Sequence, residues 1–325
     1  MRFSITLLLF TLLGLAACES DLNPGPLVDF VASSRFNTGN RRLTTPGDTV
    51  ATRIYARTQG DNTLQRMRIT AEYQPVPEGI IYPQVGYQEG EQPSFTLVYL
   101  DTTFTGSRQE FAFQSVQPSR TTAGKETWLY EATDNNEDKG KRSFFLRLGR
   151  ADSAYIYHSY RIGLQAPASN NTTRRSFLAL RSGLALPKFT VYKAPQNDIA
   201  QQLVDLVYIP NINTGPGLAT LSSKVINLKS SWPIKRQTLI RRTTLTESDF
   251  TALITEAQFT TAFTGGTRFS TLNSTSTDTS YTGAVTKNQV IAFRTPEGIS
   301  GAIFVEDILA TAVPTLVLQV RVPKR

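Results

Sequence analysis

The feature that most constrains this chain is an alternation of apolar and polar residues along its first half. In Arg66–Tyr73 the odd positions are apolar and the even positions are polar or charged. Residues 50–57 follow the same pattern, and shorter stretches continue it as far as Phe144. Successive side chains of a strand point to opposite faces of a sheet, so a period of two is typical of half-buried β-strands.

Turn-forming residues separate these stretches. Proline, glycine, aspartate and asparagine cluster at 46–48, 60–62, 118–124 and 134–140. Seven or eight short strands within about 140 residues, without an amphipathic helix, are typical of an antiparallel β-sandwich. We therefore predict such a sandwich over residues 27–165 and a chain that is mainly β.

The second half, residues 176–325, combines strand-like runs with one helical region near residues 247–263. Thr246 and Thr255 are each followed three residues later by an acid or an amide, which is the arrangement of a capping box. Large apolar side chains recur there at helical spacing. We predict a β-rich α+β domain with two short helices. Its expected strands are 189–192, 203–209, 289–293, 301–305 and 315–322.

A polar stretch lies between the two predicted domains. Residues 166–175 contain alanine, proline, serine, asparagine, threonine and arginine, and they lack an apolar period. Such a composition is typical of a loop or linker. We predict that residues 166–175 join two domains that fold independently.

The first eighteen residues have the organisation of an export signal. Arg2 supplies a positive charge, residues 5–15 are almost continuously apolar, and the sequence Leu-Ala-Ala-Cys follows at Leu15–Cys18. An apolar run of about a dozen residues is shorter than the ~20 residues of a membrane-spanning helix. The segment therefore predicts a secretory signal.

The motif Leu15–Cys18 resembles the lipobox of bacterial lipoproteins. The resemblance implies that residues 1–17 are removed as a signal peptide and that Cys18 carries fatty acyl chains, such as palmitate. Residues 18–26 would then tether the mature protein to a membrane. Several acyl chains on one cysteine hold a protein firmly to a bilayer.

The residues after the cysteine extend this resemblance. Glu19 and Asp21 are similar to the acidic surface-export signal of Bacteroidota lipoproteins, which implies an outer-membrane location facing the cell surface. Residues 27–165 resemble the immunoglobulin-like domains near the N-termini of such proteins. Residues 176–325 resemble uncharacterised C-terminal regions of the same group, and that resemblance implies no known chemistry.

Composition limits the classes of partner. Cys18 is the only cysteine, so no disulfide can form within the monomer. Hydrophobic residues make up 40% of the chain, which is enough to build ordinary cores.

The net charge is +8, but the basic residues are dispersed in pairs such as Arg41-Arg42 and Arg241-Arg242. We expect a membrane as partner through the lipid, and a glycan or another envelope protein as ligand, but no nucleic acid.

Motifs for catalysis are not found in the sequence. One histidine, His158, and one cysteine cannot form a thiol-protease site or a zinc cluster. The phosphate-binding, dinucleotide-binding and nucleophile-elbow motifs do not occur. We therefore predict that the protein is not an enzyme and uses no cofactor. His158 shares its strand face with apolar residues, so we expect it in a core or at its rim.

The loop Asp134–Gly140 has oxygen-bearing side chains at alternate positions, as calcium loops do. Lys139 and Phe145 occupy the positions where an EF-hand needs glycine and glutamate. A hairpin turn is therefore the preferred interpretation, and an adventitious calcium ion is the alternative. We predict no metal centre.

Tyr155, Tyr157 and Arg161 occupy the other face of the strand that holds His158. Aromatic rings beside an arginine form a flat amphipathic surface that can hold a sugar. We therefore name these residues as a possible glycan contact. The alternative is ordinary packing of tyrosines across strands.

Three short acidic–hydroxyl–apolar sequences resemble the O-glycosylation sequon of exported Bacteroidota proteins. Their hydroxyl residues are Thr49, Thr102 and Ser153. The resemblance implies possible O-linked glycans at these positions, and the alternative is that all three are ordinary strand or turn residues.

These observations predict a non-enzymatic, surface-anchored lipoprotein of the cell envelope that binds an unidentified ligand or serves a structural role. The alternative is a glycan-binding accessory lipoprotein or a carbohydrate-active enzyme of a polysaccharide uptake system. A glycan binder would present exposed, coplanar aromatic rings in a cleft. A glycoside hydrolase would present two carboxylates about 5–10 Å apart across one groove.

Overall fold

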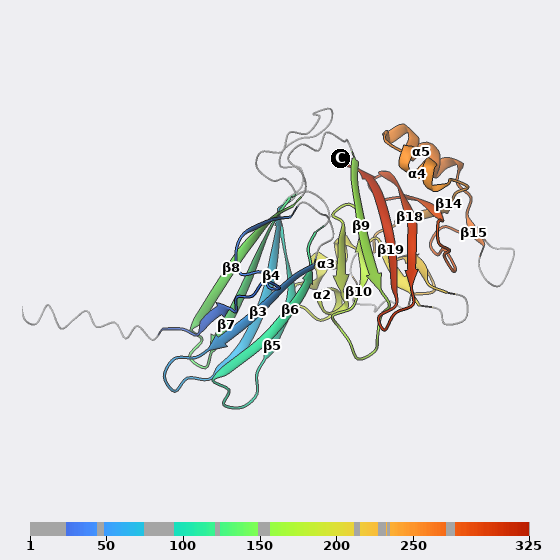
Figure 1. Cartoon of the computed structure of the whole chain (residues 1–325). Helices are drawn as coiled ribbons and strands as arrows, with labels where there is room; N and C mark the ends of the chain where they lie inside the picture. The colour runs from blue at the N-terminus through green and yellow to red at the C-terminus, as the bar shows by residue number, and fades with distance from the viewer. Residues whose placement is uncertain are drawn as a thin grey trace, which may run out of the picture.

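The computed structural model describes most of the chain after residue 23. The described residues are 24–43, 49–74, 94–120, 124–148, 157–210, 215–226, 232, 235–270 and 277–324. They form two regions, which we call the sandwich (residues 24–148) and the C-terminal region (residues 157–324) (Figure 1). Strands dominate both regions, so the prediction of a mainly β chain is confirmed.

Two sheets build the sandwich. The first has the order β1-β3-β6, with β1 Leu27–Phe30, β3 Thr49–Arg57 and β6 Glu110–Pro118. The second has the order β2-β8-β7-β4-β5, with β2 Arg41–Leu43, β8 Lys139–Leu148, β7 Gly124–Asp134, β4 Leu64–Gln74 and β5 Phe95–Thr103. Strand β2 pairs with β8 in parallel, and the other paired strands are antiparallel.

The alternation of the sequence becomes the alternation of burial in these strands. Every second residue of β7 is buried, and the residues between them are half-exposed. Trp128 and Tyr130 of β7 lie on the inner face, where the ring of Phe30 from β1 meets Tyr130 edge-on at 5.1 Å between centroids. The inner faces of the two sheets therefore share one core.

Two further sheets build the C-terminal region. A five-stranded sheet has the order β14-β17-β18-β19-β9, with β14 Leu239–Arg242, β17 Val290–Arg294, β18 Ser300–Leu309, β19 Thr315–Pro323 and β9 Tyr157–Gln165. A four-stranded sheet has the order β11-β10-β12-β13, with β11 Leu184–Pro187, β10 Arg175–Ala179, β12 Leu206–Ile209 and β13 Gly217–Thr220. Strands β15 Phe269–Ser270 and β16 Thr277–Asp278 form a small ribbon.

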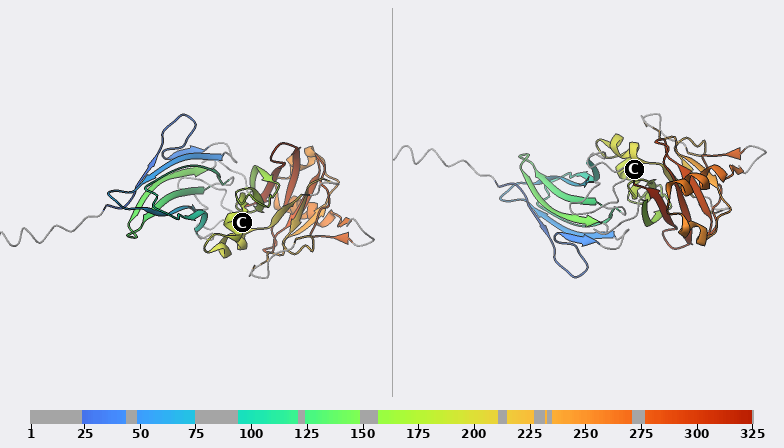
Figure 2. Two further views of the ribbon diagram at one scale, coloured as in Figure 1. Left: turned by 90° about the horizontal axis from the view of Figure 1, so that it is seen from below. Right: turned by 90° about the horizontal axis from the view of Figure 1, so that it is seen from above.

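These sheets and the helices of the C-terminal region are stacked in layers (Figures 1 and 2). Side chains such as Ile303 and Leu318 pack the five-stranded sheet against the four-stranded one. Helices α4 (Glu247–Ala252) and α5 (Glu256–Gly265) cover the other face, where Phe250 and Phe259 pack against Phe304 and its neighbours. Both helices lie on the side away from the sandwich.

Strand β9 corrects the predicted domain boundary. Residues 157–165, which we assigned to the sandwich, pair with β19 from Tyr157 opposite Pro323 to Gln165 opposite Thr315. Tyr160, Ile162 and Leu164 face the core between the two C-terminal sheets. The alternation identified a strand correctly, but a sequence period does not indicate which sheet a strand joins.

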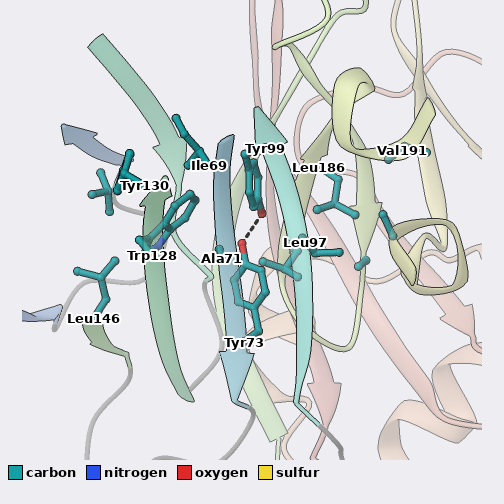
Figure 3. Packing of buried hydrophobic residues seen from close by; sticks show 14 of the residues in the cluster. Ile69, Ala71, Tyr73, Leu97, Tyr99, Trp128, Tyr130, Leu146, Leu186 and Val191 are labelled. Carbon is teal, nitrogen blue, oxygen red and sulfur yellow. Dashed lines mark hydrogen bonds between the residues drawn. The ribbon is translucent and has the colours of Figure 1, made fainter. Parts of the chain in front are cut away.

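The predicted interdomain linker is also wrong. Residues 166–175 lead from β9 into β10 through a tight turn, in which Ala168 bridges Asn171, so both ends lie in the C-terminal region. The two regions share one buried cluster, because Leu186 and Val191 of the C-terminal region pack beside Leu97 and the other β5 residues (Figure 3). The prediction of two independently folding halves is therefore not supported by the packing.

One segment predicted as a strand is a helix. Residues 189–192 belong to helix α2 (Lys188–Tyr192), which is followed by α3 (Asn197–Leu203). Short apolar runs are ambiguous between strand and helix, and tertiary packing selects one of them. Thr190 donates to the carbonyl of Val98 in β5 at 2.9 Å, so α2 closes the edge of the sandwich. Helices α4 and α5 confirm the helices predicted near 247–263.

Candidate functional site

The helices α4 and α5 begin where their capping boxes predicted. The hydroxyl of Thr246 accepts from the backbone N–H of Asp249, and the Asp249 carboxylate accepts from the Thr246 N–H at 2.8 Å. The hydrogen bonds that the Asp249 carboxylate accepts from the N–H and the hydroxyl of Thr246 lower its pKa. Thr255 and Gln258 form the same reciprocal pair at the start of α5. Each box satisfies two N-terminal donors that have no partner within the helix.

Two arginines from the sheet hold the C-terminal ends of the same helices. Arg241 of β14 donates to the carbonyls of Phe263, Thr264 and Gly266 at 3.1–3.3 Å, and its guanidinium lies 4.7 Å from the Phe263 ring. Arg321 of β19 donates in the same way to three carbonyls at the end of α4. A positive charge at a helix C-terminus is stabilised by the negative end of the helix dipole.

Gly266 allows the end of α5 to approach β14 closely. A Cβ at this position would lie 2.9 Å from the Arg241 Cβ and 3.0 Å from the Arg242 carbonyl oxygen, which is too close for a side chain. Next to it, Arg242 and Thr267 exchange backbone hydrogen bonds of 2.8 Å each. The helix end is therefore joined directly to the edge strand of the five-stranded sheet.

A groove of about 850 Å³ lies between helix α5 and the chain that leaves β14. One wall is a single face of α5 that includes Ala257, Thr261 and Gly265. Leu245 and Leu253 supply larger apolar surface. The volume lies within the range of about 300–1,000 Å³ that is usual for small-molecule sites. We take this groove as the candidate functional site.

Arg242 contributes to the lining, but its side chain lies on the face of β14 opposite to that of Arg241, because successive residues of a strand point to opposite faces. The neighbouring Arg241 is occupied by the carbonyls of α5. The other polar groups in the lining are threonine hydroxyls and the amide of Gln258. The groove is therefore mostly apolar, and its polar groups are hydroxyls and an amide.

Within the predicted glycan contact, Tyr157 is buried and Arg161 is exposed. Tyr157 is only 5% exposed, because helix α5 covers it and its ring meets Phe259 at 6.0 Å. Arg161 is held by the Glu306 carboxylate at 2.8 Å. Tyr155 lies outside the described residues. The prediction of Tyr157 as a sugar platform is wrong because the sequence did not show that helices cover this face of the sheet.

His158 lies half-buried in β9, on the same strand face as Tyr160. Burial lowers the pKa of His158 well below its usual range, and the positive charges of Lys324, Arg120 and Arg181 lower it further. Burial likewise lowers the pKa of Lys324 to about 8. His158 is therefore neutral at neutral pH.

The loop after β7 is a hairpin turn. One oxygen of the buried Asp134 carboxylate accepts from the backbone N–H groups of Asn136 and Asp138 at 2.9 and 3.0 Å, and the other accepts from the Asn62 amide. The Asp134 carboxylate thus organises the turn between β7 and β8, as the preferred interpretation required. Within the described residues, acidic, histidine and cysteine side chains do not gather in groups of three or more.

The remaining predicted positions are scattered. Thr49 begins β3 and is exposed, and Thr102 lies half-buried in β5. Cys18 and Ser153 fall outside the described residues. Among the described helices, none has the length and apolar character needed to cross a bilayer.

The groove is not predicted by any sequence pattern, although the helices that form its wall are. Arg242 was recognised only as one member of a dispersed arginine pair. A local signal did exist, because Gly265-Gly266 follows the predicted helix directly and marks its end. The partner wall at 242–245 comes from another element, which no local pattern could reveal.

Comparison with known proteins supplies no family. The chain matches no protein-family model and no curated protein. Among solved structures it is similar to a DUF4466 family protein from Parabacteroides merdae, with 11% identity and a TM-score of 0.36 over 92% of this chain and 99% of that one. It is also similar to Spo0M, a sporulation control protein from Bacillus subtilis, with 10% identity and a TM-score of 0.26 over 60% of this chain and 78% of that one. Likenesses at this level transfer no function, so the site must be interpreted from its own chemistry.

Proposed function

We propose that this chain is a lipid-anchored protein of the cell envelope that acts by binding a small ligand and not by catalysis. The observation that carries the binding role is the groove of about 850 Å³ between α5 and residues 242–245. Its threonine hydroxyls and glutamine amide are groups that orient a ligand by hydrogen bonds. The anchor rests on the lipobox-like motif at Leu15–Cys18.

The placement of the groove agrees with this role. The described chain begins on the sandwich, where Pro26 lies so close to Gly140 that a Cβ at Gly140 would collide with the Pro26 carbonyl. Helices α4 and α5 lie at the opposite end of the molecule (Figure 1). A tether on the N-terminal side would therefore hold the sandwich near the membrane and direct the groove away from it.

The anchor is tested by metabolic labelling with an alkyne fatty acid in a bacterial host that processes lipoproteins. We expect the unmodified chain to be labelled and to stay with the membrane after a carbonate wash. Cys18→Ser should lose both properties, whereas Ser20→Ala, two residues away, should keep them. A Cys18→Ser chain that retained the label would contradict the anchor.

The binding role is tested separately, by native mass spectrometry of the chain purified from its own host envelope under mild conditions. We expect a bound small molecule that is absent from Gly265→Trp. A Cβ at Gly265 meets no atom within 4 Å, so the tryptophan can enter the groove without disturbing the backbone. Gly39→Trp, which is equally open but lies on the sandwich, is the matched control. The same ligand on both variants would contradict the role of the groove.

A further inference from the structure

The loop between β5 and β6, residues 104–109, presents an exposed arginine at the end of the sandwich where the described chain begins. We propose that Arg108 of this loop binds the phosphate of a phospholipid headgroup and so fixes the orientation of the protein on its membrane. This inference rests on the proposed lipid anchor and is independent of the groove. Three observations carry it: the support of the guanidinium by two aromatic rings, its free charge, and the position of the loop beside the tether.

Two phenylalanines hold the Arg108 guanidinium at the seam between the two sheets of the sandwich. Its central carbon lies 5.2 Å from the ring centroid of Phe104 and 5.8 Å from that of Phe111. Phe104 directly follows β5 of one sheet, and Phe111 lies in β6 of the other. A cation within about 6 Å of an aromatic ring is attracted to it. The rings therefore position the arginine without neutralising its charge.

The backbone of the loop is fixed as well. The Phe104 N–H donates to the Gln65 carbonyl at 2.7 Å, and the Arg108 carbonyl accepts from the Leu64 N–H at 2.6 Å. Both partners lie at the start of β4. Binding through a loop that is already ordered loses less conformational entropy than binding through a flexible one. Arg108 is therefore prepared for a partner outside the chain.

The charge of Arg108 is available to such a partner. Its side chain is exposed, and no carboxylate among the described residues lies within ion-pair distance of it. Arg66, at the same end of the sandwich, is instead paired with Asp101. Asp61 and Glu110 also lie at this end, so the surface as a whole is not strongly basic. The contact therefore depends on one guanidinium, whose planar fork can donate two parallel hydrogen bonds to one phosphate.

The loop lies beside the point where the tether would leave the sandwich. The Gly25 carbonyl accepts from the Gln59 side chain at 3.2 Å, and the neighbouring Thr58 N–H donates to the Gln109 carbonyl at 2.9 Å. Gly25 follows Cys18 by seven residues, which span at most about 25 Å. The bilayer that holds Cys18 is therefore within reach of this end. The tether also raises the effective concentration of headgroups at the loop, so a single weak contact can be occupied.

Coupling Cys18 to a maleimide-bearing lipid in vesicles reproduces the tether chemically, because Cys18 is the only cysteine. The chain from Cys18 onward contains every described residue. Hydrogen–deuterium exchange of residues 104–110 is measured on vesicles of phosphatidylglycerol and of phosphate-free digalactosyldiacylglycerol, each relative to the uncoupled chain. We expect exchange to slow about threefold or more on phosphatidylglycerol and to stay unchanged on the galactolipid.

Arg108→Gln should abolish this slowing while circular dichroism and the thermal midpoint stay unchanged. Arg268→Gln, which alters an exposed arginine of the C-terminal region, is the matched control and should keep it. Equal exchange on the two lipids, or slowing that persists in Arg108→Gln, would overturn the phosphate contact. The lipid comparison on the unmodified chain decides the matter even if Arg108→Gln fails to fold. None of these outcomes depends on acylation in the cell, which the fatty-acid labelling tests separately.

Discussion

The sandwich and the C-terminal region bury their strands in different ways. In β7 of the sandwich, buried and half-exposed residues alternate from Gly124 to Asp134. In β18 of the C-terminal region, six consecutive residues from Ser300 to Val305 are buried. The outer face of the sandwich sheet meets solvent, whereas the C-terminal sheet lies between a second sheet on one face and helices on the other. Strands covered on both faces lose the alternation that strands covered on one face show.

The two regions also differ in where they place their charged side chains. On the sandwich, Asp101 pairs with Arg66 at a surface where the arginine is 45% exposed. In the C-terminal region, Asp205 is 1% exposed and accepts from the Leu180 N–H, the Arg236 guanidinium and the Thr238 hydroxyl at 2.7–2.9 Å. The buried Asp205 carboxylate connects several segments of the chain, whereas the Asp101–Arg66 pair links two neighbouring strands. We therefore expect the loss of Asp205 to lower the free energy of unfolding more than the loss of Asp101.

The largest expected effect is therefore at Asp205. Replacing Asp205 by alanine should cost about 3–5 kcal/mol of unfolding free energy, because the Leu180 N–H and the Thr238 hydroxyl lose their buried acceptor and Arg236 keeps only the Glu297 carboxylate. Asp101→Ala on the sandwich should cost no more than about 1 kcal/mol. Urea unfolding followed by circular dichroism measures both values. Equal losses of unfolding free energy in the two variants would contradict the expected difference between the two regions.

The same variant tests whether the shared core couples the regions. Trp128 lies in the sandwich and Trp232 in the C-terminal region, and they are the two tryptophans of the chain. In a Trp232→Phe background, fluorescence reports on the sandwich alone. Asp205→Ala should still lower the urea midpoint seen at Trp128, since the buried cluster is continuous across the regions. An unchanged midpoint would mean that the sandwich folds independently.

The second-largest expected effect is a pH dependence of stability that comes from Glu126 in the sandwich. Burial raises the pKa of Glu126 to about 7, although its carboxylate accepts from the Trp128 indole and the Arg120 backbone N–H. The folded state then binds the proton more tightly than the unfolded state, so stability falls as pH rises from about 4.5 to 7. The loss is about 3 kcal/mol. Glu126→Gln should remove this fall in stability. The test compares the free energies of unfolding of Glu126→Gln and of the unmodified chain across the same pH range.

His158 in the C-terminal region produces the opposite pH dependence of stability. Burial lowers its folded-state pKa, so its contribution to stability is present above about pH 6.5 and is lost as pH falls. His158→Gln should become more stable relative to the unmodified chain below pH 6.5. Thermal midpoints measured from pH 5 to 8 test this direction, and a relative gain at high pH would contradict it.

The smallest expected effect concerns the capping of α5. Thr255→Ala removes the hydroxyl that accepts from the Gln258 N–H and should cost about 1 kcal/mol. Thr260→Ala, an exposed change within the same helix, should stay within about 0.5 kcal/mol. Guanidinium titrations of both variants provide the comparison. If the two variants behave alike, the cap does not stabilise the helix in the folded protein.

Local patterns in the sequence determined the mainly β character, the strands of the sandwich and the starts of α4 and α5. Each of these depends on contacts between neighbours in the chain. An alternating strand needs one apolar face, and a capping box needs two residues three positions apart. The positions of Thr246 and Thr255 at the starts of two helices therefore follow from the amino-acid sequence alone.

Tertiary structure alone decided which sheet received β9, that residues 189–192 became a helix, and that α5 covered Tyr157. It also brought residues 242–245 beside α5 to form the groove. The physical reason is the same in each case. A strand with one apolar face can be buried by either of two sheets, and the free energy that selects between them comes from contacts distant in sequence.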